Sequence, residues 1–174
     1  MKNFIVIDIE SDGPCPGEYS MVSFGAVTWE GETFYGEVSP ISDVWIPEAL
    51  NVSGISREKH LTFPDPEDTM WKFREWLERA PTAGDRRRVM WSDNPAFDWQ
   101  FINYYLHRFT GANPLGFSAR RIGDLYAGFK GNIYASNSWK KLRKTRHDHD
   151  PVNDAKGNME ALKTIISRHH KNPE

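Results

Sequence analysis

The sequence has a single cysteine, Cys15, so no disulfide bond can form within the chain. A chain with so few thiols fits a reducing compartment. No apolar run is long enough to cross a bilayer, and the N-terminal residues lack the basic, apolar and small-residue regions of a secretory signal. These absences predict a cytoplasmic protein that is not anchored in a membrane.

The sequence also lacks a large excess of positive or negative charge: the net charge is −2 at pH 7 and the isoelectric point is about 6.3. This balance excludes a domain that holds nucleic acid through bulk positive charge. Positive charge is instead concentrated in one segment, the basic stretch, which comprises Lys140, Lys141, Arg143, Lys144 and Arg146. The basic stretch is either a solvated helical face or a surface that contacts phosphates near the functional site, and both readings stay open.

Repeats, linkers and low-complexity segments are also missing. A chain of 174 residues, 39% of them hydrophobic, can form one well-packed core but is short for two domains, so we expect one domain over residues 1–174. The seven tryptophans indicate either a heavy core or surfaces that stack on bases. Trp71 and Trp76 fit helix packing, whereas the role is open for Trp29, Trp91, Trp99 and Trp139.

Hydrophobic periodicity and turn signals predict strands mixed with helices. Strands are expected over residues 3–10, 20–29, 32–39 and 88–91, with the second and third paired as a hairpin. Helices are expected from Pro66, after an Asp65 cap, and over residues 95–109, 119–129, 138–143 and 151–169, whereas residues 41–63 are expected to be mostly loop. This order is typical of an α/β fold with a mixed central sheet flanked by helices.

Asp8 and Glu10 stand at the end of the most apolar run of the chain, Phe4 to Ile9. In a strand, residues two apart share a face, so both carboxylates point to the same side. Buried carboxylates repel each other and lose hydration unless a cation or hydrogen-bond donors compensate. A bound divalent metal ion is the simplest compensation, and it would turn this strand end into a catalytic site.

Two further acidic residues are predicted at the same edge of the sheet. Asp98 falls in the first turn of a helix that directly follows a strand. Asp154 falls in the first turn of the final helix, for which Asp150 is the cap and Pro151 the first residue. Because open α/β sheets bind ligands at the C-terminal ends of strands, these segments can deliver carboxylates to one place. His149 is expected on the loop before the final helix, close to the carboxylates but not among the metal ligands.

Together these residues form a set of motifs: D-x-E followed by S-x-G, F-D on a helix entered through N-P, and H-x4-D-A. The set comprises Asp8, Glu10, Ser11, Gly13, Asn94, Phe97, Asp98, His149, Asp154 and Ala155. In this order and spacing it resembles the DEDDh 3′–5′ exonucleases, the RNase H-like nucleases that include RNase T, oligoribonuclease and polymerase proofreading subunits. The turn at residues 52–56 and the segment from Ser138 to Leu142 also look like family landmarks, so the resemblance covers nearly the whole chain.

The resemblance implies an RNase H-like fold and a hydrolase that releases nucleoside 5′-monophosphates from the 3′ end of single-stranded nucleic acid. Two Mg²⁺ or Mn²⁺ ions would be held about 3.5–4 Å apart. Asp8 would bridge both ions, and Glu10 and Asp154 would bind the first. Asp98 would act directly or through water, and His149 would take the proton of the attacking water, since histidine titrates near neutral pH. RNA is favoured over DNA, and a homodimer is expected, because the chain is similar in size to RNase T and oligoribonuclease.

The same resemblance predicts the residues that contact the substrate, namely Ser11, Gly13, Asn94, Phe97, Lys140 and Lys144. The sequence departs from the family pattern where Pro151 replaces a common alanine and Ser53 a common histidine. A stiff loop, Pro14 to Gly17, follows the first motif and leaves the shape of the terminal-nucleotide pocket open.

Other acidic and histidine residues near the motifs have simpler expected roles. Asp12 is expected to be a turn residue and not a fifth ligand. His147 precedes Asp154 by seven residues where the family spacing is five, so it is expected on the surface or against a phosphate. His107, His169 and His170 are expected on helix surfaces.

Three functions from different classes remain after this reading. The first is the metal-dependent exonuclease. The second is a nucleic-acid binding module on an inactive nuclease fold. Such a module would lack one of the acidic ligands or the histidine, and this sequence has all five residues. The third is a phosphoesterase for nucleotides or small phosphates, for which the basic stretch would be irrelevant. The dependence of the rate on strand length separates the third from the first.

Overall fold

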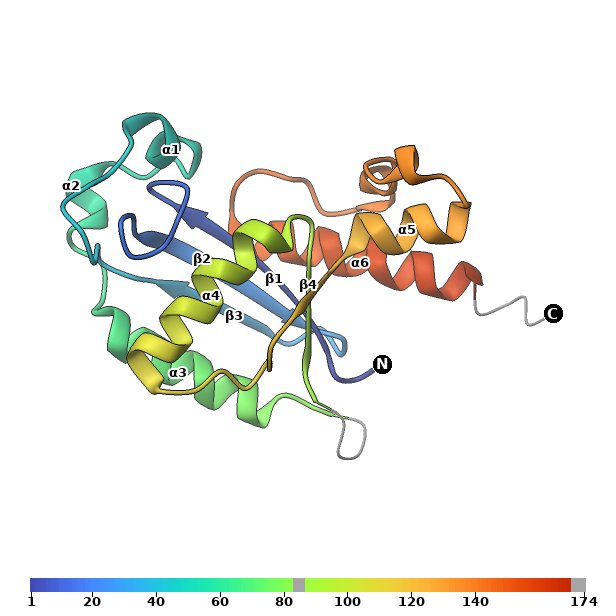
Figure 1. Ribbon diagram of the computed structural model, residues 1–174, viewed down its shortest axis with the longest axis horizontal. Helices are drawn as coiled ribbons and strands as arrows, with labels where there is room; N and C mark the ends of the chain where they lie inside the picture. The colour runs from blue at the N-terminus through green and yellow to red at the C-terminus, as the bar shows by residue number, and fades with distance from the viewer. Residues whose placement is uncertain (83–86, 170–174) are drawn as a thin grey trace.

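The computed structural model describes residues 1–82 and 87–169, and these residues form a five-stranded sheet at the centre of the molecule (Figure 1). The strands are β1 (Phe4–Ser11), β2 (Met21–Thr28), β3 (Thr33–Glu37), β4 (Val89–Ser92) and β5 (Ala119–Arg121). Their spatial order is β3-β2-β1-β4-β5. β1, β2 and β3 pair antiparallel, whereas β4 and β5 continue the sheet in the direction of β1. β1 therefore lies in the middle of the sheet.

Helices cover both faces of this sheet (Figure 1). They are α1 (Pro47–Val52), α2 (Arg57–His60), α3 (Pro66–Arg79), α4 (Pro95–Thr110), α5 (Ile122–Lys130) and α6 (Pro151–His169), with the 3-10 helices η1 (Ile133–Ala135) and η2 (Ser138–Leu142). Ile5, Ile7 and Ile9 of β1 pack in one core cluster with α3 and α4. Val6 packs in a second cluster with α5 and α6. The alternation of residues along β1 thus separates two cores, as a strand covered on both faces requires.

The predicted fold class is confirmed, and so are the longest elements. Asp65 caps α3, because its Oδ1 accepts a hydrogen bond of 2.7 Å from the backbone N–H of Glu67. The apolar side of α3 is buried, as expected, at Met70, Phe73, Leu77 and Ala80. The bounds of α6 are those predicted, and its inward side is buried at Ala155, Met159, Leu162 and Ile166. Strong periodicity over many residues made these helices predictable.

The structure corrects one predicted element and refines two others. Residues 119–121 were expected to begin a helix, but they form the edge strand β5, which exists because it pairs with residues 90–92 of β4. The segment 41–63, expected to be mostly loop, contains the short helices α1 and α2. Elements of three to six residues are too short for a periodic pattern to show. The helix expected over residues 138–143 is the 3-10 helix η2.

Among the described residues, no helix is both long and apolar enough to cross a membrane. His107 and His169 lie on helices as expected, whereas His170 lies outside the described residues.

Candidate active site

Three carboxylates come together at the C-terminal end of β1. Asp8 and Glu10 project from the strand, and Asp154 comes from the first turn of α6. One oxygen of each lies within 4.8 Å of the others, a spacing at which all three can bind one cation. Glu10 and Asp154 are buried. Part of the Asp8 surface is open to solvent, yet protein atoms surround its carboxylate closely enough for burial to raise its pKa.

A glycine allows α6 to reach these strand residues. Gly25 of β2 is the sheet partner of Asp8. A Cβ built on Gly25 would overlap the backbone of Pro151 and Val152, so the first turn of α6 rests directly on the sheet. Because Asp154 lies in that first turn, the missing side chain at residue 25 sets the distance between Asp154 and the carboxylates of β1.

The fourth acidic residue, Asp98, lies in the first turn of α4, which begins just after β4. Its side chain is buried, with 4% exposed. The negative charge of Asp98 raises the pKa of Asp8, so Asp98 acts on the same cluster. It is not part of the group whose oxygens lie within 4.8 Å of one another. The structure therefore brings the four predicted acidic residues to one edge of the sheet, with Asp98 outside the group whose oxygens lie closest together.

Burial raises the pKa values of three of these carboxyls, those of Asp8, Glu10 and Asp98. Burial is the largest cause for Asp8, whose pKa lies well above its ordinary value, and the charges of its acidic neighbours raise it further. Burial raises the pKa of Glu10 to about 7, and the Asp154 charge adds to this. Burial also raises the pKa of Asp98 to about 7. Each carboxylate is thus costly to ionise unless positive charge is supplied nearby.

The cluster fits a hard divalent cation. Asp154 Oδ2 is buried and has no hydrogen-bond partner among the described residues. A buried carboxylate oxygen beside other carboxylates is the arrangement that a cation stabilises. The group of Asp8, Glu10 and Asp154 offers only carboxylate oxygens, which suit Mg²⁺ or Mn²⁺ better than soft metals.

Two histidines stand at the rim of the cluster. His149 Nδ1 lies 3.5 Å from Glu10 Oε1, and His147 Nδ1 lies 2.6 Å from Asp154 Oδ2. The second distance is that of an ion pair, which forms when the His147 ring is protonated. The rings of the two histidines are 4.6 Å apart. His147, expected on the surface or against a phosphate, is half-exposed but contacts a carboxylate of the cluster.

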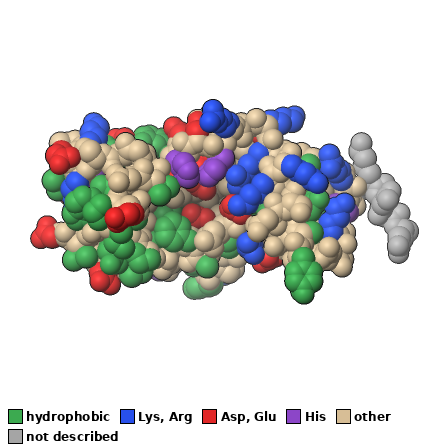
Figure 2. Space-filling view, turned by 90° about the horizontal axis from the view of Figure 1, so that it is seen from above, with side chains coloured by type: hydrophobic (Ala, Val, Ile, Leu, Met, Phe, Trp, Pro, Cys, Tyr) green, Lys and Arg blue, Asp and Glu red, His purple; other side chains and the backbone are tan. Residues whose placement is uncertain are grey.

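The carboxylates lie in a hollow with an apolar and a basic side. In Figure 2, acidic side chains are visible in the middle of the face, hydrophobic side chains gather on one side of them and Lys and Arg on the other. On the apolar side, a cavity of about 380 Å³ is lined by Glu10, Ser11, Gly13, Pro14, Ile46, Ala49, Val52 and Phe97. The sequence analysis predicted Ser11, Gly13 and Phe97 as substrate contacts. It did not predict that α1 would form part of the cavity wall, because this segment was expected to be loop.

On the basic side, one aspartate fixes two cations of the basic stretch. Lys140 Nζ lies 2.7 Å and Arg143 Nη2 lies 3.3 Å from Asp93 Oδ2. The Arg143 side chain is 10% exposed, and its charge lowers the pKa of Asp8. Arg143 therefore compensates part of the negative charge of the cluster, a role that the sequence analysis missed. Lys144 is exposed, so it is free to meet a phosphate from solvent.

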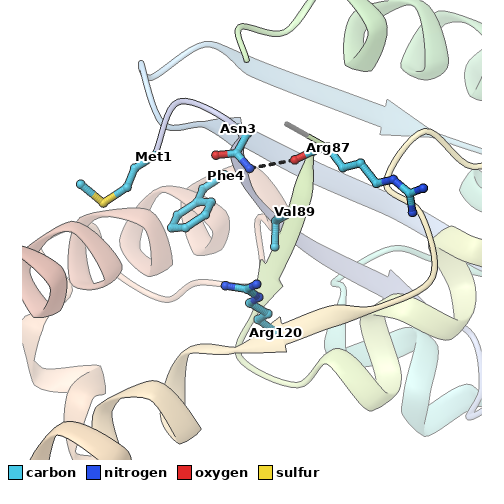
Figure 3. Close-up of a pocket in the computed structure, with 6 residues that line it drawn as sticks. All are labelled: Met1, Asn3, Phe4, Arg87, Val89 and Arg120. Carbon is cyan, nitrogen blue, oxygen red and sulfur yellow. Dashed lines mark hydrogen bonds between the residues drawn. The ribbon is translucent and has the colours of Figure 1, made fainter. Parts of the chain in front are cut away.

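A second cavity, of about 390 Å³, lies at the opposite end of β1 (Figure 3). It is lined by Met1, Asn3, Phe4, Arg87, Val89 and Arg120, and the Asn3 side chain crosses it to donate a hydrogen bond of 2.7 Å to the Arg87 carbonyl oxygen. No carboxylate or imidazole lines it. Of the two ends of β1, only the C-terminal end therefore carries the carboxylates and imidazoles that hydrolysis requires.

Comparison with known proteins identifies the family. The chain is 38% identical over 175 residues to a protein of Escherichia coli named 3′-5′ DNA exonuclease Cap18, covering 93% of this chain and 90% of that protein. This chain belongs to the DEDDh 3′–5′ exonucleases. No family model matches it.

Solved structures share the fold of this exonuclease. The nuclease domain of 3′hExo, a DEDDh family member bound to rAMP, matches with a TM-score of 0.69 and 13% identity, over 94% of this chain and 92% of that one. Exonuclease X in complex with 5′ overhanging duplex DNA matches with a TM-score of 0.63 and 16% identity, over 96% and 93%. The expected RNase H-like sheet flanked by helices is confirmed by these likenesses.

The exonuclease uses Asp12 in a way that the sequence did not indicate. Asp12 lies in a bend, as expected, but its carboxylate is fully buried and pairs with Arg57 Nη1 at 2.9 Å. The backbone N–H of Ser20 donates a hydrogen bond of 2.6 Å to the other oxygen. The backbone carbonyl of Asp12 accepts a hydrogen bond from Ile46. Asp12 thus ties α2, through Arg57, and the start of α1, through Ile46, to the end of β1, and α1 forms part of the wall of the apolar cavity.

The surroundings of the remaining predicted positions are as follows. Asn94 precedes α4, and its backbone carbonyl accepts hydrogen bonds from the N–H groups of Phe97 and Asp98; the residue does not line the apolar cavity. The Ser11 hydroxyl donates to the Gly13 carbonyl at 2.7 Å. Trp91 and Trp139 are buried in the core and have no face free for a base.

Proposed function

We propose that this exonuclease degrades single-stranded DNA from the 3′ end, with two divalent cations and a histidine base, and releases nucleoside 5′-monophosphates. The observation that carries the proposal is the buried group of Asp8, Glu10 and Asp154, whose oxygens lie within 4.8 Å of one another. Repulsion in this group is compensated when cations bind, and binding them is what phosphodiester hydrolysis requires. The 38% identity to a protein named a DNA exonuclease supports the same reading.

The four acidic residues would divide the metal binding between them. Asp8, Glu10 and Asp154 would hold the Mg²⁺ or Mn²⁺ ions through the oxygens that lie within 4.8 Å of one another. Asp98, which lies outside this group, would contribute directly or through water. The cations, when bound, would neutralise the phosphate and stabilise the attacking and leaving oxygens.

His149 would be the general base. Its Nδ1 faces Glu10 Oε1 at 3.5 Å, so Nε2 is the nitrogen available for the proton of the attacking water. As the water oxygen bonds to phosphorus, the bond from phosphorus to the 3′ oxygen of the preceding nucleotide breaks. The products are a nucleoside 5′-monophosphate and a strand shortened by one nucleotide with a 3′-hydroxyl.

The two sides of the hollow would hold different parts of the strand. The apolar cavity beside Glu10, with Phe97 in its wall, suits the terminal base and sugar. The exposed Lys144 and the paired Lys140 and Arg143 on the other side suit the phosphates that precede the scissile one. A strand can fill the apolar cavity with its terminal nucleotide and contact the basic side with its preceding phosphates, so it would bind better than a free nucleotide. An esterase for small phosphates would not show this preference.

Comparison of matched RNA and DNA strands tests the substrate class. The sequence analysis favoured RNA, and discrimination depends on contacts to the 2′-hydroxyl. Single strands of one sequence, labelled at the 5′ end, are incubated with Mn²⁺, Mg²⁺ or EDTA. We expect a ladder that shortens from the 3′ end of DNA, needs the metal and is absent for Asp8→Asn. Faster digestion of RNA would reverse the choice of substrate, and intact strands with every metal would refute the exonuclease.

His149→Ala tests the base. We expect turnover to fall by about 10²-fold or more, because a positioned general base contributes about 10²–10⁴-fold, while Mn²⁺ affinity stays within a few-fold. Calorimetric titration with Mn²⁺ and the initial rate of digestion measure the two quantities. His107→Ala, an exposed histidine on α4, is the matched control. A His149→Ala variant that digests DNA at the wild-type rate would refute the assignment.

We also propose that residues 1–174 act as one exonuclease domain and that two copies associate, as the resemblance to RNase T and oligoribonuclease implies. Multi-angle light scattering during size-exclusion chromatography measures the mass in solution. A mass equal to that of one chain, 20.1 kDa, at all concentrations would exclude the dimer.

A further inference from the structure

The catalytic carboxylates share one member with a second group of potential metal ligands. His147, His149 and Asp154 each offer one atom within 4.8 Å of the other two. The first group, Asp8, Glu10 and Asp154, has oxygen donors only, whereas this one has two imidazoles and one carboxylate. Asp154 belongs to both groups. A cation bound by the histidines would therefore draw on the same carboxylate as the catalytic metal.

The histidine group places an imidazole nitrogen directly against a buried carboxylate. Asp154 Oδ2 is buried and lies 2.6 Å from His147 Nδ1, the distance of an ion pair. A tetrahedral zinc with bonds of about 2.0–2.1 Å holds two ligands about 3.3 Å apart. Small rotations of the two side chains would open the present contact to that distance. Both histidine side chains are about half-exposed, at 50% and 45%, so an ion can enter from solvent.

The loop that carries the histidines is fixed to α6 by contacts before the two histidines and between them. Before them, the N–H groups of Lys144 and Thr145 donate to Glu160 Oε2 at 2.8 and 2.9 Å. Between them, the Asp148 N–H donates to Asp154 Oδ1 at 3.2 Å. The Asp148 carboxylate accepts from the Asn153 side chain at 3.1 Å. The two imidazoles are thus held beside Asp154 before any ion arrives, which lowers the entropy cost of binding one.

His149 also has an unusual backbone that supports this arrangement. Its φ is 63°, in the left-handed region, and it is the one described residue other than glycine with a positive φ. Such a conformation costs free energy and persists where surrounding contacts impose it. With this backbone the rings of His147 and His149 stand 4.6 Å apart, on the same side of the loop. Histidine side chains gather at the middle of the face in Figure 2, next to the acidic hollow.

From these contacts we propose that His147, His149 and Asp154 form a zinc site that inhibits the nuclease. Imidazole nitrogens favour Zn²⁺, whereas Mg²⁺ prefers oxygen ligands, so the histidines select the inhibitor and not the activator. Bound zinc would occupy His149, the proposed base, and Asp154, a proposed ligand of the catalytic metal. The inhibitory part rests on the proposed exonuclease function; the binding part does not.

Zinc binding is measured first, without any substrate. Zn²⁺ is titrated calorimetrically into the protein in a large excess of Mg²⁺, which competes for the oxygen-only group. We expect one zinc per chain, and an affinity at least about tenfold weaker in His147→Ala. His107→Ala and Glu10→Gln should bind zinc like the wild type, because the first residue lies on α4 and the second belongs to the other group. Thermal unfolding in EDTA checks that each variant is folded.

The effect on activity is then read as a ratio within each variant. Digestion of labelled DNA in Mg²⁺ is timed with and without Zn²⁺, so a change in basal rate does not enter the comparison. We expect inhibition of about tenfold or more in the wild type and less than about twofold in His147→Ala.

The results separate the zinc site from the nuclease. Equal zinc affinity in the wild type and His147→Ala would overturn the site, and zinc binding through His147 without inhibition would overturn its regulatory role. A protein that digests nothing with any metal would refute the nuclease, while the calorimetric result would still decide whether the zinc site exists.

Discussion

At the scale of single residues, the site depends on carboxylates that are held together against their repulsion. Glu10 and Asp98 have pKa values raised to about 7, mainly by burial. A carboxyl with a raised pKa favours its protonated form in the folded protein. Without a cation, the contribution of these two carboxyls to stability is therefore fully present below their ordinary pKa values of about 4 and is lost as the pH rises through 7. A bound divalent cation reverses the effect, because it stabilises the ionised form.

The pH dependence of unfolding tests whether ionisation of the buried Asp98 carboxyl destabilises the metal-free protein. In EDTA, we expect the melting temperature of the wild type to fall between pH 5 and pH 8, whereas Mg²⁺ should raise it more at pH 8 than at pH 6. Asp98→Asn removes one buried charge, so it should stabilise the metal-free protein at pH 8 by about 1–4 kcal/mol. Scanning calorimetry with and without EDTA measures these changes. A variant less stable than the wild type at pH 8 in EDTA would contradict the account.

At the scale of elements, the site is assembled by the contact of α6 with β2 and by the position of α1 and α2. α6 brings Asp154, and its first turn lies against the backbone of Gly25. α1 forms part of the wall of the apolar cavity, and the buried pair of Asp12 and Arg57 anchors α2, which follows α1 in the chain. Each contact can be broken without changing a residue that is proposed to bind metal or substrate.

Gly25→Ala tests the first contact. The added Cβ would overlap the backbone of α6, which cannot rotate away as a side chain can. We expect a destabilisation of about 1–3 kcal/mol and a fall in turnover, because Asp154 moves away from Asp8. Gly128→Ala is the matched control: Gly128 lies within α5 with nothing within 4 Å of its Cβ, so the change should be neutral or stabilise by about 0.4–1 kcal/mol. Equal effects of the two substitutions on urea unfolding and on digestion rate would refute the role of Gly25.

Arg57→Ala tests the second contact. Asp12 is fully buried and would lose its cation, so we expect a destabilisation of about 3–5 kcal/mol. Because α1 forms part of the cavity wall, KM should rise more than kcat falls. Lys59→Ala, an exposed neighbour on α2, should stay within about 0.5 kcal/mol of the wild type. Urea unfolding and steady-state kinetics measure both variants. An unchanged KM in a folded Arg57→Ala variant would show that the ion pair does not shape the cavity.

At the scale of the whole molecule, the charge is distributed unevenly although the net charge is only −2. The acidic hollow would attract metal ions, whereas the basic stretch on its other side would attract phosphates (Figure 2). A nucleic acid can therefore bind a protein with an acidic isoelectric point, because it meets the basic side first.

Lys144→Ala tests the basic side. An exposed lysine that contacts a phosphate contributes to affinity regardless of base sequence, so we expect weaker binding of every single strand. The slope of log affinity against log salt should fall by about 1. Fluorescence anisotropy with labelled DNA in Ca²⁺ and increasing NaCl measures this slope. Lys72→Ala, an exposed lysine on α3, is the control, and an equal change in both variants would show that Lys144 contacts no phosphate.

The sequence by itself determined the long elements and the identity of the acidic residues. The apolar run before Asp8 and the regular spacing in α3 and α6 are repeated over many residues, so they predict strands and helices that tertiary contacts only confirm. The motif order also indicated the family, because carboxylates at such positions have few other uses. The RNA preference that the sequence favoured stays a prediction.

Only the tertiary structure decided the parts that depend on contacts between distant segments. β5 exists through pairing with β4, and the cavity wall exists because Arg57 reaches Asp12, 45 residues earlier. The contact of His147 with Asp154 depends on the left-handed backbone of the loop and on its ties to α6. Periodicity reports which residues share a face of one element. It contains no information on which side chains of separate elements meet, and that information decided the surroundings of the site.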